Sequence, residues 1–354
     1  MKIKKRISEL EIIRFICCLL IVLHHADVFS AYSMNGQYAV GFFFILSGFF
    51  MQQDAAKSLH SSVPFVKEKS TFTFILSRFK HIFPYFIVSI AVGLTAWSAM
   101  RLVVGPLLWK ISHIWPEVFL LQMFASWPSG WWITGVAWFL GALFAGQLLL
   151  YPVAKFCAKR SIFGIFVIST FISWGIILVG FPNAFKEPGS IWFGTLRQGL
   201  LLAWAGLSFG AALGEIYEYC PLMFLKKWAN VRFLLYFIAL SAMFTNCPGL
   251  WIWGILGCGI LLSVLRANTI KSKLSNLSLA NFLGEWSITL YLNHYYWALG
   301  INTKFPFFPA TTKWALYWGL SFLTSLFVWW LVRRVGPYLW DTMQRLAGNV
   351  KISI

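Results

Sequence analysis

The stretch ELEIIRFICCLLIVLHHADVF, residues 9–29, is apolar enough to cross a bilayer, yet it contains Arg14, His24, His25 and Asp27. A helix needs about 20 mostly apolar residues to span the hydrocarbon core. Each ionisable group near the centre of such a helix costs roughly 2.5–3.5 kcal/mol on insertion scales. Such groups face the protein interior or a water-filled cavity rather than lipid. The stretch therefore predicts a membrane helix with a polar site beside it.

The composition of the whole chain is typical of an integral membrane protein. Of its 354 residues, 59% are hydrophobic and 11% are charged, whereas soluble domains carry about 25% charged residues. The basic start, MKIKKR, resembles that of a signal peptide, but no small-residue cleavage site follows the apolar run. We therefore expect this run to remain as the first transmembrane helix.

A window of about 20 residues locates about ten candidate spans along the chain. They lie at 9–30, 39–53, 81–104, 134–154, 161–181, 191–213, 231–246, 248–266, 280–300 and 314–333. The apolar stretch 115–133 is interrupted by Pro and Gly, so we interpret it as an interfacial or re-entrant segment. The predicted fold class is an all-α polytopic membrane protein, in which residues 1–354 form one domain without an appended soluble domain.

The segments between these spans form two sets that differ strongly in positive charge. Most of the 29 Lys and Arg residues fall in the set that includes the N-terminus. The opposite set holds Arg101, Lys110, Lys186, Lys304 and Lys313. Because cytoplasmic loops collect Lys and Arg, we predict cytoplasmic termini and a multi-pass location in the plasma (inner) membrane. The lipid bilayer then explains the net charge of +18 without nucleic acid as a partner.

The cysteines and histidines show no spacing that predicts a metal site. Cys17 and Cys18 are adjacent rather than arranged as CxxC, and no Cys/His cluster has zinc-ligand spacing. We therefore expect neither a bound metal nor a disulfide framework.

Helix geometry places Arg14 and His25 on one face of the first span. They are eleven positions apart, which leaves an angle of about 20° between them and a separation of roughly 16 Å along the axis. His24 is turned by about 80° from Arg14 and lies about one turn below Asp27, with which it can pair. The face combines a cation near the cytoplasmic end with a titratable base deeper in the membrane. The alternative is that Arg14 extends to the lipid headgroups and that the histidines bond neighbouring helices.

The second span contains small residues within an aromatic run. Gly41, Ser47 and Gly48 interrupt AVGFFFILSGFFM, residues 39–51. Small residues let helices approach closely in lipid, and this explains them adequately. Alternatively, the Ser-Gly step allows a ligand to approach the backbone.

These stretches together resemble the membrane acyltransferase 3 family. The resemblance begins with Arg14 and His25, separated by ten residues, and with FFFILSGF at 42–49. The stretch LSRFKHIFPYF at 76–86 is similar to the basic cytoplasmic stretch of that family, here with Arg78. Further segments follow in the family's order, so the resemblance covers nearly the whole chain.

Two later helices carry the rest of the resemblance. AWFLGALFAGQLLLYP at 137–152 resembles the family's Trp-x-Leu helix that ends at a proline, and LGEWSITLYLNHYYW at 283–297 resembles its late helix with Tyr291 and His294. Many members carry a glutamate in the Trp-x-Leu helix, where this chain has the apolar residues Leu143 and Phe144. No carboxylate partner for His25 is therefore assigned.

The resemblance implies transfer of an acyl group, most often acetyl, from cytoplasmic acyl-CoA across the bilayer. The acceptor would be a hydroxyl of a surface polysaccharide or a lipid-linked sugar. Arg14, Arg78 and Lys80 would bind the phosphates of acetyl-CoA, and His25 would act as general base or accept the acyl group itself. Four further residues are candidates for a supporting role: His24, Asp27, Ser47 and His294. Two more are candidates for contact with the acceptor substrate: Arg197 and Tyr291.

A transporter or flippase of a sugar-type or lipid-linked substrate is the alternative function. The same polar face would then conduct a substrate or protons. Against this alternative, the sequence has no visible paired halves and few carboxylates within its spans. A purely structural membrane protein would leave the Arg14–His25 face unexplained.

Overall fold

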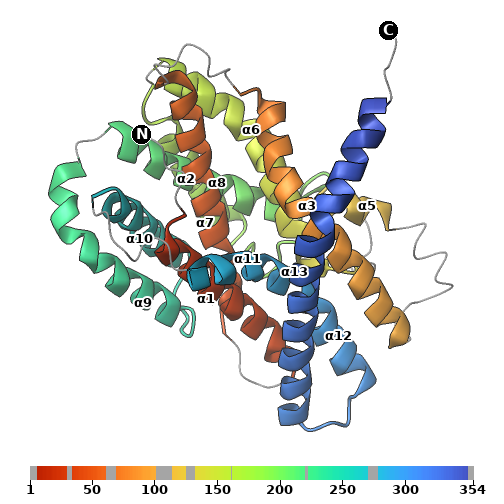
Figure 1. Ribbon diagram of the computed structural model, residues 1–354. Coiled ribbons are helices and arrows are strands. Elements are labelled where there is room, and N and C mark those ends of the chain that lie inside the picture. Colours follow the sequence, from red (N-terminus) through yellow and green to blue (C-terminus); the bar gives the residue numbers. More distant parts are fainter. Residues whose placement is uncertain are drawn as a thin grey trace.

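The computed structural model describes residues 6–29, 34–60, 69–100, 114–124, 132–160, 162–219, 222–269 and 278–349. These residues are mostly helical (Figure 1). The α-helices are α1 (Ser8–His25), α2 (Val40–His60), α3 (Thr71–Ala99), α5 (Trp115–Val118), α6 (Trp138–Arg160), α7 (Ile165–Gly180), α8 (Gln198–Tyr219), α9 (Arg232–Ala242), α10 (Gly249–Thr269), α11 (Ser278–Asn293), α12 (Tyr295–Lys304) and α13 (Ala310–Asn349). Short 3-10 helices are η1 (Ala26–Phe29), η2 (Gly36–Ala39), η4 (Gly135–Ala137) and η5 (Leu222–Val231).

Seven helical segments of the described chain are long and apolar enough to cross a membrane. They contain α1, α2, α3, α6, α8, α10 and α13, and α7 is a shorter apolar helix. The chain is therefore a membrane protein of the predicted all-α class. Helices also occupy parts of the other predicted spans, but the count of ten is not confirmed by length and composition. The orientation of the termini stays a prediction.

The start of α3 differs from the predicted third span. The helix begins at Thr71, because the Ser70 side chain accepts a hydrogen bond from the backbone N–H of Thr73 at 3.1 Å and caps it. The prediction placed this start near residue 81. Arg78 and Lys80 therefore lie on a helix and not on a cytoplasmic loop.

The sixth and ninth predicted spans also need correction. Residues before α8 form an antiparallel hairpin of β1 (Ile191–Phe193) and β2 (Leu196–Arg197), with Gly194 at a φ of 58° in its turn. Arg197 consequently precedes α8 and does not lie within it. The ninth span is divided at His294 into α11 and α12. The Asn293 side chain braces this break, since its amide N–H groups donate to Ser89 Oγ at 2.9 Å and to the Thr289 carbonyl at 2.7 Å.

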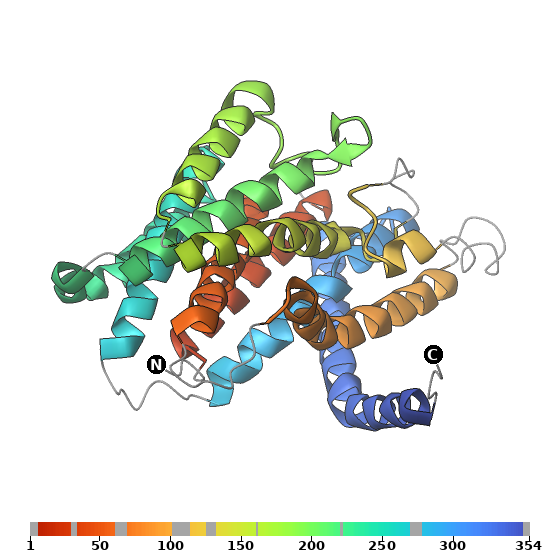
Figure 2. The same ribbon diagram turned by 90° about the horizontal axis from the view of Figure 1, so that it is seen from above.

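The centre of the molecule is formed by α1 and α2, which lie between α9 and α10 on one side and α3 and α13 on the other (Figure 2). Glycines bring α2 and α8 together: a Cβ at Gly48 would overlap the Leu207 carbonyl, and one at Gly210 would overlap the Ile45 carbonyl. Close helix packing, the first of the two interpretations, therefore accounts for Gly48. The helices α1 and α11 also pack together, and the Cys18 thiol donates to the Ser287 carbonyl at 3.1 Å.

Candidate functional site

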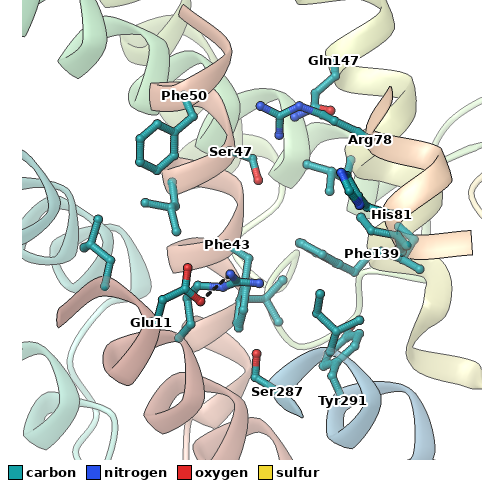
Figure 3. Close-up of a pocket in the computed structure, with 18 of the residues that line it drawn as sticks. Glu11, Phe43, Ser47, Phe50, Arg78, His81, Phe139, Gln147, Ser287 and Tyr291 are labelled. Carbon is teal, nitrogen blue, oxygen red and sulfur yellow. Dashed lines mark hydrogen bonds and ion pairs between the residues drawn. The ribbon is translucent and has the colours of Figure 1, made fainter. Parts of the chain in front are cut away.

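A cavity of about 480 Å³ lies between α1, α2, α3, α6 and α11 (Figure 3). We call it the larger cavity. Its wall contains many aliphatic and aromatic side chains, among which polar groups are spaced. The polar lining residues are Arg6, Glu11, Arg14, Ser47, Arg78, His81, Gln147, Ser287 and Tyr291. Figure 3 shows Gln147 and Arg78 at one end of the cavity and Ser287 and Tyr291 at the other.

Arg14 and Arg78, two of the three predicted donor-binding residues, line this cavity. Lys80 does not line it and is exposed, although it lies on the same helix as Arg78. His81 lines the cavity but was not among the predicted residues. Residues three apart share a helix face, so His81 follows from Arg78 once both are known to lie on α3.

Arg14 is already paired with a carboxylate in the larger cavity. Its guanidinium donates to Glu11 Oε2 at 2.9 Å. Glu11 is buried against α11, where a Cβ at Gly284 would overlap its carboxylate. The prediction missed Glu11, although an acid three residues before an arginine on a helix is a usable signal.

Arg78 makes a different contact. Its guanidinium carbon lies 4.6 Å from the centre of the Phe74 ring, and no ion pair joins it to a carboxylate among the described residues. The planar guanidinium therefore retains its capacity to bind an anion bidentately.

A smaller cavity of about 80 Å³ lies further along α1. Its lining includes His24 and His25, whereas Arg14 lines the larger cavity. Tyr291 and Val40 line both cavities and so stand between them. The Tyr291 hydroxyl donates to the Val136 carbonyl at 2.7 Å, which fixes its ring.

His25 lies among aromatic rings at the smaller cavity. Its ring centre is 5.2 Å from that of His294 and 4.9 Å from that of Tyr295. Neither ring nitrogen of His25 has a hydrogen bond to any other described residue. His294 is buried, and its Nδ1 lies 3.2 Å from the Leu290 carbonyl, while its Nε2 has no partner within the described ranges. The sequence singled out both histidines but did not predict their contact.

His24 has a separate set of partners. Its Nδ1 lies 2.8 Å from the Met34 carbonyl and 3.6 Å from Asp27 Oδ2. Asp27 Oδ2 also accepts a hydrogen bond from the Met34 backbone N–H at 3.3 Å. The proximity of His24 to Asp27 agrees with the expected pairing, and both side chains contact the backbone of Met34, shortly before η2.

The remaining predicted residues are divided between the two cavities and the β1–β2 hairpin. Ser47 lines the larger cavity. Arg197 lines neither cavity, and its guanidinium donates to the Gly189 carbonyl. Lys186, which was not predicted as a site residue, lines the smaller cavity instead. In the part of the chain that the structure describes, no group of three or more His, Cys, Asp or Glu side chains could hold a metal ion.

One further lining residue was missed. Gln147 is completely buried on α6, and neither its Oε1 nor its Nε2 has a partner among the described residues. The sequence did contain a signal for Gln147, because it is a polar residue within the apolar stretch LFAGQLLLYP, residues 143–152.

Comparison with known proteins identifies the family of the chain. No curated protein and no solved structure matches the chain. A family model described as an acyltransferase domain, Acyl_transf_3, matches residues 7–334, nearly the whole chain. The residues that line both cavities fall within this range, except for Arg6 of the larger one. The chain therefore belongs to the acyltransferase 3 family and is a membrane acyltransferase.

Proposed function

We propose that this acyltransferase moves an acetyl group from cytoplasmic acetyl-CoA to a hydroxyl of a surface polysaccharide or a lipid-linked sugar. The observation that carries the proposal is the order of the two cavities along α1. The larger one contains the guanidinium groups of Arg14 and Arg78, and the smaller one contains the imidazole of His25. A donor bound with its phosphates at the cationic end would direct its thioester towards Tyr291 and His25.

The cationic groups of the larger cavity suit the phosphates of coenzyme A. Arg78 forms no ion pair with a carboxylate of the described residues, although the nearby Asp54 carboxylate attracts it electrostatically. Arg6, which pairs with Glu285, and His81 line the same cavity. Arg14 is held by Glu11. Guanidinium groups bind phosphate bidentately, which a lysine cannot do. In this proposal the phosphates of the donor lie nearer to Arg78. Arg14 contacts a part of the donor beyond the phosphates, closer to Tyr291.

His25 would carry out the proton transfer at the smaller cavity. As a general base it accepts the proton of the acceptor hydroxyl while the hydroxyl oxygen bonds to the thioester carbonyl carbon. The carbon–sulfur bond then breaks, and the leaving thiolate of coenzyme A receives the proton from His25. In the second route the neutral His25 imidazole attacks the thioester carbonyl carbon, the carbon–sulfur bond breaks, and coenzyme A leaves as the thiol with the imidazole proton. The acceptor hydroxyl then attacks the acyl-imidazole, and its proton returns to the imidazole as the ester forms.

The lining of the smaller cavity supports a sugar as the acceptor. Trp138, Phe185 and Trp253 contribute aromatic surface, while His24 and Lys186 contribute polar groups. Aromatic faces pack against the apolar face of a sugar ring, and polar groups bind its hydroxyls.

Labelled acetyl-CoA tests this proposal directly. Membranes that contain the full chain should transfer radiolabel from acetyl-CoA to glycan, and mild base should release the label as acetate. Membranes with the His25→Ala variant at the same level serve as the control and should transfer little label. If the glycan crosses the membrane while the label stays on acetyl-CoA, the chain is a flippase or transporter instead.

The proposed reaction requires the cytoplasmic side to face the larger cavity. We predict that reporter fusions after residues 157 and 354 report a cytoplasmic location and that fusions after 186 and 307 report the outside, because positive charge collects in the inner segments. The measurement is the activity of a reporter that works on one side of the plasma (inner) membrane only. An outside location of the C-terminal reporter would require an odd number of spans and contradict the topology.

A further inference from the structure

Gln147 is a buried side chain whose hydrogen-bonding groups are unused. It lines the larger cavity from α6, is fully buried, and has neither a donor nor an acceptor partner within the described ranges. An amide that is removed from water without a hydrogen bond destabilises the fold. A ligand that fills the cavity would supply the missing partners.

Two other glutamines give a useful comparison. In the described chain, Gln52 and Gln122 are also buried with both amide atoms unpaired. Neither of them lines the larger or the smaller cavity. Of these three glutamines, Gln147 is therefore the one that borders a cavity.

The surroundings of Gln147 indicate the chemistry of that ligand. Figure 3 shows Gln147 at the same end of the cavity as Arg78, with Ser47 on the way to Tyr291. The Ser47 hydroxyl has no hydrogen bond to another described residue. Between these groups the wall is formed by aliphatic and aromatic side chains, such as Phe50. The arrangement fits an extended ligand with an anion at one end and amide groups along a largely apolar chain.

We infer that Gln147 and Ser47 bind the amide groups of the donor's pantetheine arm. The inference rests on the proposed use of acetyl-CoA. A glutamine side chain can donate to the carbonyl of one amide and accept from the N–H of another. The anionic end of the same ligand would lie beside Arg78. A lipid tail in this cavity would leave the Gln147 amide unpaired.

Binding of two related ligands to the purified full-length protein tests the inference. Coenzyme A has the pantetheine arm, whereas adenosine 3′,5′-bisphosphate lacks it. The Gln147→Leu variant should bind coenzyme A about tenfold more weakly, because one to two hydrogen bonds are lost. Its affinity for adenosine 3′,5′-bisphosphate should equal that of the wild type. Ser47→Ala is the second variant and should show the same selectivity, with a loss of about threefold.

The matched control is Gln52→Leu, which removes a buried unpaired amide away from both cavities. It should leave the affinity for both ligands unchanged. Equal binding of coenzyme A by the wild type and by both the Gln147 and Ser47 variants would overturn the inference, as would an equal loss for both ligands. A wild-type protein that binds no coenzyme A would overturn the proposed donor, and the inference with it.

Discussion

Replacing His25 by alanine should lower acyl transfer by about two orders of magnitude or more, the usual contribution of a general base. The amount of folded protein should not change, because His25 makes ring contacts but no hydrogen bond to the described chain. The measurement is the rate of acylation of the acceptor, with each variant present at the same level in the membrane.

The matched control for His25 is its neighbour. His24→Asn keeps a polar side chain near the Met34 carbonyl and Asp27, so a substantial fraction of the activity should remain. If the His24 variant is inactive in acyl transfer and the His25 variant is active, the catalytic role belongs to the His24–Asp27 pair. Full activity in both variants would show that neither histidine of α1 acts as the general base.

The relation between Arg14 and His25 could be predicted because it depends on one helix alone. The helical repeat sets the angle between two positions of the same segment, whatever packs around it. In the structure Arg14 lines the larger cavity and His25 lines the smaller one further along α1, with Val40 and Tyr291 shared between the two. The same local rule would have revealed Glu11, which lies one turn before Arg14.

Other parts of the fold depend on contacts that no local pattern contains. The hairpin that displaces Arg197 from α8 is apolar enough to be mistaken for the start of a span. The break at His294 is braced by Ser89 of α3, far away in the sequence. The contact between His25 and His294 likewise joins α1 to the end of α11. Hydropathy identifies apolar segments but gives no information about these pairings.

The second large effect is expected at Arg14. Arg14→Ala should weaken the binding of acyl-CoA by about one to two orders of magnitude, the range for hydrogen bonds to charged groups. The variant also leaves the buried Glu11 carboxylate without its partner, and this negative charge would repel the donor phosphates. The affinity of the Arg14→Lys variant for acyl-CoA should lie between those of the Arg14→Ala variant and the wild type. Lysine keeps the positive charge but lacks the planar guanidinium that binds bidentately. The measurement is the dissociation constant of acyl-CoA on membranes or purified protein.

A double variant separates donor binding from the packing of α1. Arg14→Ala combined with Glu11→Gln removes the unpaired buried carboxylate, so a loss of folded protein in the single variant should be reversed in the double variant. The affinity of the double variant for acyl-CoA should stay low. Arg160→Ala is the control for loss of one positive charge, because Arg160 packs on the Phe156 ring, forms no ion pair with the described residues and lines neither cavity. Its affinity should equal that of the wild type. If the double variant binds acyl-CoA as tightly as the wild type, Arg14 serves only to neutralise Glu11. The affinity for the donor would then depend on Arg78, at the other end of the larger cavity.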